Sequence, residues 1–201
     1  MSQTSNLPTP TDNIVNAVIA WWRSLYPDPV YQTRGDAGAR ASIRRANSSL
    51  DVLLQPATHV MFQKVKAKTG DVLSEEMLRR LALAAAALCE LRTTERSGTA
   101  FARALGANST DEPARLSPLR FQNLMAAMNR DDDSDKLTAL RRAMAMLKDS
   151  PINVHGLVRG ILFYNDETRM RWTFAYFNTS RATEQDTTDT PTLSASEEPV
   201  S

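Results

Sequence analysis

The sequence has few of the residues on which catalytic and metal sites are usually built. It contains one cysteine and two histidines in 201 residues, and neither histidine comes with a local partner motif. The phosphate-binding patterns G-x-x-x-x-G-K-[ST] and G-x-G-x-x-G are absent, as is a serine at a nucleophile elbow. We therefore expect a protein that is not an enzyme and that holds no metal and no organic cofactor.

The single cysteine, Cys89, cannot form an internal disulfide, which fits a reducing compartment. No apolar run approaches the length of about 18 residues that a membrane span needs, since the longest candidate, residues 81–91, is interrupted by Glu90. The first residues also lack the basic region followed by an apolar one that marks secretion. We expect a cytoplasmic protein without a membrane segment.

Glycine and β-branched residues are scarce, whereas alanine and leucine are plentiful, which favours helices over sheets. In several segments, apolar residues recur at steps of three and four after a candidate N-cap residue. These N-cap candidates are Asp12, Ser74, Ser117 and Ser150. The sequence thus predicts an all-α fold, a two-lobed helical bundle with a disordered N-terminus and a disordered C-terminal tail.

Composition sets the expected boundaries of this bundle. The two ends are rich in serine, threonine and proline, and the stretch 106–113 is loop-like. We expect a disordered segment over 1–12, an N-terminal helical lobe over 13–110, a C-terminal helical lobe over 111–179 and a disordered acidic tail over 180–201.

The formal net charge of +1 conceals an uneven distribution. All 24 lysines and arginines lie within residues 23–181, but six of the 23 acidic residues lie outside that interval, which leaves 17 acids and a net charge of +7 inside it. Nineteen of the 24 cations are arginines, the side chain whose planar fork of donors fits phosphate. A basic body with an acidic tail indicates a nucleic-acid partner.

The densest arginine cluster lies in the segment 34–46, RGDAGARASIRRA. A helix that begins near Asp36 would place Arg40 and Arg44 four residues apart on one face, with Arg45 beside them. Such a face repels itself unless an anion sits opposite. A solvated helix face with scattered positive charge is an equal alternative for this segment on its own.

Two other patterns have ordinary structural explanations. Trp21 and Trp22 could stack on bases, but large aromatic residues on an apolar helical stripe usually belong to the core. The acidic run 131–135 would need glycine in place of Lys136 and glutamate in place of Arg142 to form an EF-hand, so we expect these acids to start a helix.

A set of motifs spread over residues 14–178 resembles the CasB family, the small subunit of the type I-E CRISPR interference complex Cascade. The residues that carry the resemblance are Trp22 and Leu25, the run Gly35-Asp36 followed by Ala-Arg-Ala-x-Ile-Arg-Arg-Ala up to Ala46, Arg120-Phe121 with Leu124, Leu140-Arg141-Arg142, and Asn153 and Leu157 ahead of Arg171-Trp172 and Tyr176. The chain departs from the family pattern by inserting Ala37-Gly38-Ala39 between Asp36 and Arg40.

The resemblance implies a non-catalytic, all-helical protein that works inside a larger assembly. Its partners would be the backbone, large and guide-processing subunits of Cascade, the guide RNA, and the target DNA, mainly the displaced non-target strand. Two copies would pack head to tail along the belly of the assembly. RNA-guided recognition leaves the choice of sequence to base pairing, so this subunit would contact the nucleic-acid backbone without reading bases.

We expect arginines from several helices to form, in part, one basic surface that holds single-stranded DNA. The candidates are Arg40, Arg44, Arg45, Arg120, Arg130, Arg141, Arg142, Arg169 and Arg171. Because Arg141 and Arg142 are expected to be exposed, replacing both should leave folding nearly unchanged. Two rival classes remain open, a helix-turn-helix regulator and a plain protein scaffold.

Overall fold

The computed structural model describes residues 9–28, 30, 32–70, 72–92, 97–106 and 113–178. Residues 1–8 and 180–201, for which the sequence predicts disorder, lie outside these ranges. The middle of the predicted joint between the two lobes, residues 107–112, also lies outside them.

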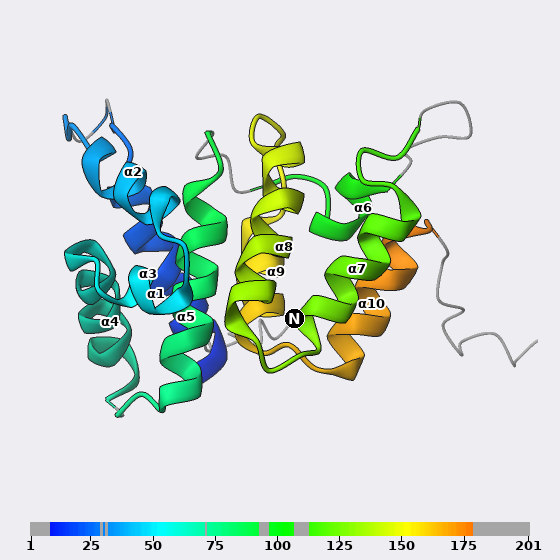
Figure 1. The fold of residues 1–201 in the computed structure, drawn as a ribbon. Coiled ribbons are helices and arrows are strands. Elements are labelled where there is room, and N and C mark those ends of the chain that lie inside the picture. The colour runs from blue at the N-terminus through cyan, green and yellow to red at the C-terminus, as the bar shows by residue number, and fades with distance from the viewer. Residues whose placement is uncertain are drawn as a thin grey trace, which may run out of the picture.

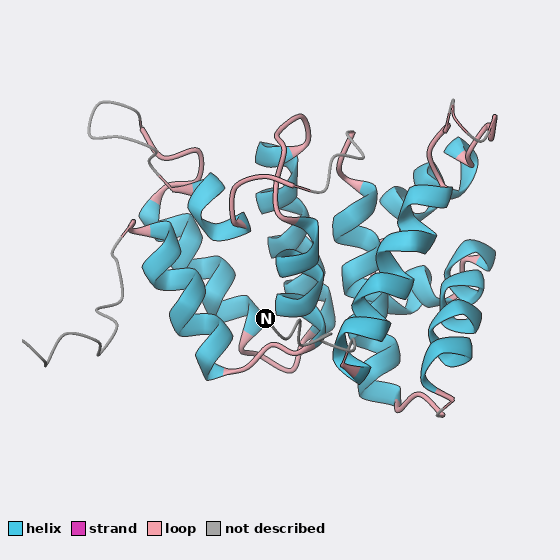
Figure 2. Cartoon of the chain, turned by 180° about the vertical axis from the view of Figure 1, so that it is seen from behind, coloured by secondary structure: helices cyan, strands magenta, loops and turns pink. Residues whose placement is uncertain are grey.

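The described residues form ten α-helices joined by loops, and the only extended pairings among these residues are two isolated bridges. The helices are α1 (Pro10–Ser24), α2 (Ala37–Arg45), α3 (Ser49–Leu53), α4 (Pro56–Thr69), α5 (Glu75–Cys89), α6 (Phe101–Leu105), α7 (Pro118–Met128), α8 (Asp133–Leu147), α9 (Val154–Leu162) and α10 (Asp166–Tyr176) (Figure 1, Figure 2). The predicted all-α fold class is confirmed.

Several helices begin at the polar residues that the sequence indicates. The carboxylate of Asp36 accepts a hydrogen bond from the amide of Ala39 at 2.7 Å, and the hydroxyl of Ser74 accepts one from Met77 at 3.2 Å. Asp132, in the acidic run, caps α8 in the same way. These side chains satisfy amides that have no partner within the helix, so the acidic run has the helix-starting role that we expected.

The start of α1 differs from the prediction. Thr9, not Asp12, is the N-cap: its hydroxyl accepts from the amide of Asp12 at 3.2 Å and donates to the Asp12 carboxylate at 2.7 Å. Pro10 occupies the first helical turn, where its missing N–H costs nothing. Asp12 therefore closes a capping box from inside the helix, and residues 10–12 are helical.

The start of α9 also differs from the prediction at Ser150 and Pro151. The side chain of Asn153 accepts from the amide of Gly156 at 2.8 Å and is the N-cap. The residues before it are extended, because the amide of Asn153 donates to the carbonyl of Thr99 at 2.9 Å and Ile152 forms a bridge with Thr99. This long-range pairing delays the helix by three residues.

The two tryptophans of α1 belong to the core. Trp21 and Trp22 are 1% and 0% exposed. Their indole N–H groups donate to the carbonyls of Ala57 at 2.8 Å and Leu88 at 2.9 Å, respectively. Buried indoles with satisfied donors are structural anchors, so the core interpretation is confirmed over the base-stacking one.

Helix α5 lies at the centre of the fold and packs against α2, α3, α8 and α9. Five alanines between Ala82 and Ala87 are all buried, and such small side chains let neighbouring helices approach closely. Helix α6 packs against α8, α9 and α10, so it lies with the helices of the second half (Figure 1). The division into lobes at residue 110 stays a prediction.

The position of Cys89 predicts its reactivity. Burial, reinforced by the neighbouring Glu90 carboxylate, raises the pKa of the Cys89 thiol to about 12. The thiolate is the reactive form, so very little of it is present at pH 8, and raising the pH to 9 still leaves the thiol protonated. We expect the folded protein to react negligibly with a thiol-specific chromogenic reagent and the unfolded protein to release one equivalent. An L50C variant, which carries a cysteine at an exposed position, is the control that should react rapidly. Labelling of Cys89 in the folded protein as fast as that of the introduced cysteine would contradict the prediction.

Candidate nucleic-acid interface

The nine candidate arginines fall into two groups by environment. Arg40 and Arg141 are half-buried and bind main-chain carbonyls inside the fold. The other seven are exposed, namely Arg44, Arg45, Arg120, Arg130, Arg142, Arg169 and Arg171. The exposed group is the better placed of the two to present guanidinium donors to an external ligand.

Arg40 connects α2 to the end of α1. Its guanidinium carbon lies 4.2 Å from the centre of the Tyr26 ring, and its Nη1 donates to the carbonyl of Leu25. The amide of Asp36 donates to the same carbonyl at 2.9 Å. A cation over an aromatic face and a donor at a helix carboxyl end are both stabilising, so Arg40 has a structural role here.

Arg141 closes the carboxyl end of α2. Its Nη2 donates to the carbonyl of Ile43 at 2.6 Å and its Nη1 to that of Ala46, while its Nε lies 3.5 Å from a carboxylate oxygen of Glu90. Burial lowers the pKa of Arg141, and the Glu90 carboxylate opposes that shift. Arg141 is therefore not the exposed partner of Arg142 that the sequence predicts, and its burial and hydrogen bonds lead us to expect that its loss destabilises the fold.

A third arginine, which the sequence did not single out, has the same kind of role. Arg80 on α5 donates from Nη1 to the carbonyl of Leu162, at the end of α9, at 2.8 Å. The acceptor lies 82 residues away in the chain, so no local pattern marks this contact. Part of the arginine content thus binds helix carboxyl ends instead of a ligand.

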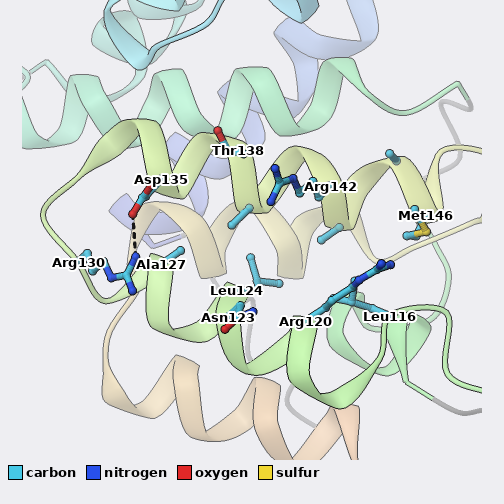
Figure 3. Close-up of a pocket in the computed structure, with 13 residues that line it drawn as sticks. Leu116, Arg120, Asn123, Leu124, Ala127, Arg130, Asp135, Thr138, Arg142 and Met146 are labelled. Atoms are coloured by element: carbon cyan, nitrogen blue, oxygen red, sulfur yellow. Dashed lines mark hydrogen bonds and ion pairs between the residues drawn. The ribbon is translucent and has the colours of Figure 1, made fainter.

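Three of the exposed arginines line one groove between α7 and α8. The groove has a volume of about 530 Å³, and it is lined by Arg120 from α7, Arg142 from α8 and Arg130 from the loop between them (Figure 3). Leu124 and Met146 are among its apolar lining residues. The groove therefore combines cationic side chains with an apolar floor, which suits a phosphate backbone with its sugars.

The charges in this groove are only partly neutralised. The Arg130 guanidinium forms an ion pair with Asp135 at 2.8 Å, drawn as a dashed line in Figure 3. Arg120 and Arg142 make no ion pair or hydrogen bond with another residue among those that the structure describes. One acid against three arginines leaves a net charge of +2 among the lining residues.

The remaining exposed arginines lie elsewhere. Arg44 pairs with Glu90 at 3.6 Å, and Arg45 contacts the hydroxyl of Ser42 at 3.5 Å. Both are on α2, which lies across α5 from α7 (Figure 1, Figure 2). Arg169 and Arg171 are on α10, and Arg171 lines a smaller hollow beside Trp172. The α7–α8 groove thus gathers three of the nine candidates, while Arg44 and Arg141 meet at Glu90. The groove also contains Asn123, a residue that the sequence did not indicate.

The described ranges contain neither a candidate metal site nor a candidate membrane-spanning helix. Within them, no group of three or more histidine, cysteine, aspartate and glutamate side chains is placed to hold a metal ion. None of the helices described is both long and apolar enough to cross a membrane.

Comparison with known proteins places the chain in a family. No curated protein sequence matches it. Two solved structures share its fold: a chain of E. coli Cascade bound to a PAM-containing double-stranded DNA target, at 21% identity and a TM-score of 0.56, and CasB from Thermus thermophilus, at 19% identity and a TM-score of 0.57. The matches cover 83% and 82% of this chain and 97% of each of the other two. Residues 39–177 match the sequence family of CRISPR-associated protein Cse2, and the chain therefore belongs to that family.

Proposed function

We propose that the chain is a non-catalytic small subunit of a Cascade-type CRISPR surveillance complex, and that it binds nucleic-acid backbone without reading sequence. Family membership supports the first part, and the solved E. coli relative is a Cascade assembly bound to target DNA. The partners would be the other Cascade subunits, a second copy of this chain, the guide RNA and the target DNA.

One observation carries the second part. Arg120 and Arg142 face the same groove, are exposed, and have no acid partner among the described residues. Guanidinium groups in that state bind phosphate through charge-assisted hydrogen bonds. Contacts of this kind hold a strand by its phosphates whatever its sequence, so we assign the groove to the displaced non-target strand of the R-loop.

The test is a salt titration of single-strand binding by an R120Q/R142Q variant. Removal of two charge-assisted hydrogen bonds should weaken binding roughly a hundredfold, because each of them contributes about a factor of ten. The slope of log affinity against log salt should become shallower by about 0.7 for each phosphate that the variant no longer binds. Fluorescence anisotropy with a labelled oligothymidylate and a mixed-sequence strand measures both quantities, and the weakening should be equal for the two strands.

An R79Q/R92Q variant is the matched control. It also removes two positive charges, but from exposed arginines outside the groove. It should therefore keep most of the affinity for single-stranded DNA. Binding by R120Q/R142Q that equals this control at every salt concentration would overturn the assignment of the groove. In the assembled complex, R120Q/R142Q should expose the displaced strand to a single-strand nuclease while assembly is kept; loss of assembly instead would favour the scaffold alternative.

A further inference from the structure

The two ends of the α7–α8 groove differ in charge. Arg130 and Asp135 lie at one end, and Arg120 and Arg142 lie toward the other (Figure 3). The guanidinium of Arg130 donates to the Asp135 carboxylate at 2.8 Å, and Asp135 is the only acid among the described residues that line the groove. The charges at the Arg130 end therefore cancel, whereas the other end carries both of the uncompensated arginines.

Both members of this ion pair are held by backbone contacts at helix ends. Arg130 follows α7, and its amide donates to the carbonyl of Ala127 at 3.1 Å. Asp135 is in the first turn of α8, and its amide donates to the capping carboxylate of Asp132 at 3.2 Å. A negative side chain is favourable in that turn, because the amide end of a helix is electropositive. The pair therefore joins the two ends of the loop between α7 and α8.

The Asp135 carboxylate changes what Arg130 can contribute to binding. Single strands gain affinity from the counterions that are released when cationic side chains neutralise phosphates. Arg130 is already neutralised, so a phosphate placed there would have to displace the Asp135 carboxylate and would then lie beside it. Arg120 and Arg142 have no such competitor among the described residues. The groove thus favours phosphates at one of its ends.

We propose that Asp135 limits the strand in the groove to the phosphates bound by Arg120 and Arg142, and that the strand leaves the groove before the Arg130 end. The inference rests on the proposed function, because it divides the same groove into a binding end and a neutral end. Asp135 then sets the extent of the binding site without binding the strand. Arg130 is the ion-pair partner of Asp135 in the unchanged chain and not a phosphate ligand.

The first experiment measures the binding of a labelled oligothymidylate at several salt concentrations. D135N frees Arg130, so it should bind about three- to tenfold more tightly at low salt. The slope of log affinity against log salt should become steeper by about 0.7, because one phosphate contact is added. R130Q/D135N removes the whole pair and keeps the net charge of the groove at +2. Its affinity should therefore stay within about twofold of that of the unchanged chain.

A D149N variant is the matched control. Asp149 pairs with Arg92 at 3.7 Å, both side chains are exposed as in the groove pair, and neither lines the groove. D149N also frees an exposed arginine, but it should leave the salt slope unchanged. A salt slope for D135N equal to that for D149N would overturn the inference. Weaker binding by R130Q/D135N, with a shallower slope, would also overturn it, because Arg130 would then already hold a phosphate.

The second experiment separates this inference from the proposed function. Isotope-edited NMR spectra of the arginine Nε–H groups show which guanidinium groups meet the oligothymidylate. In the unchanged chain the signals of Arg120 and Arg142 should shift and that of Arg130 should not, whereas all three should shift in D135N. Equal shifts of all three in the unchanged chain would overturn the inference and leave the proposed function standing. Shifts of Arg169 and Arg171, with none in the groove, would overturn both.

Discussion

Replacement of Arg141 by alanine is expected to lower the free energy of unfolding by about 3 kcal/mol. The guanidinium binds the carbonyls of Ile43 and Ala46 and lies against the Glu90 carboxylate, and the Arg141 side chain is 19% exposed. Its removal would take the guanidinium donors from both carbonyls in a largely buried site and would leave Glu90 with Arg44 as its remaining ion-pair partner among the described residues. A urea titration followed by circular dichroism measures the change in stability.

The neighbouring residue provides the control. Arg142 is on the same helix but is exposed and without an ion pair among the described residues, so R142A should change stability by no more than about 0.5 kcal/mol. R141K keeps the charge but not the planar fork that reaches two carbonyls. Its free energy of unfolding should therefore lie between those of R141A and R142A. If R141A and R142A unfold at the same urea concentration, Arg141 does not hold α2.

Replacement of Gly35 by alanine is the second change with a large expected effect, a loss of about 2 to 4 kcal/mol. Gly35 has a φ of +64°, a left-handed conformation that strains other residues. A Cβ atom there would also lie 2.4 Å from the carbonyl carbon of Tyr26 and 2.7 Å from the carbonyl oxygen of Leu25. The turn between α1 and α2 would have to open, which would break the hydrogen bond from Arg40 to Leu25.

Gly70 separates the two causes. Its φ of +71° is similar, but an added Cβ would meet nothing within 4 Å. G70A therefore carries the conformational strain alone and should cost about 1 kcal/mol. Thermal unfolding of both variants tests the difference, and equal melting temperatures would show that the close approach at Gly35 is relieved without cost.

The sequence predicts those parts of the fold that depend on near neighbours. The caps at Asp36, Ser74 and Asp132 are local patterns, and the structure has hydrogen bonds at each of them. The prediction for α1 was wrong although its capping box, formed by Thr9 and Asp12, is also a local pattern. The prediction for α9 was wrong because of a distant contact. At α9, the start depends on pairing with Thr99, more than 50 residues away, which no window of sequence contains.

The candidate interface is predicted less completely than the fold, because arginines that are adjacent in the sequence make different contacts. Arg141 and Arg142 are consecutive and of the same type, yet one points to carbonyls 95 and 98 residues away while the other lines the α7–α8 groove. A helix turns by about 100° per residue, so consecutive side chains meet different surroundings. Composition reveals that arginine is abundant, but only packing decides which guanidinium groups remain available.

The position of α1 affects how the chain folds while it is being synthesised on the ribosome. Its apolar face packs against α4, α5 and α9, and the acceptor for the Trp22 indole lies 66 residues downstream. Synthesis proceeds from the N-terminus, so α1 is complete long before α9 exists to pack against it. Incomplete chains with uncovered apolar surface are the species that aggregate or recruit chaperones. The first helix to be translated is therefore among the last to be enclosed.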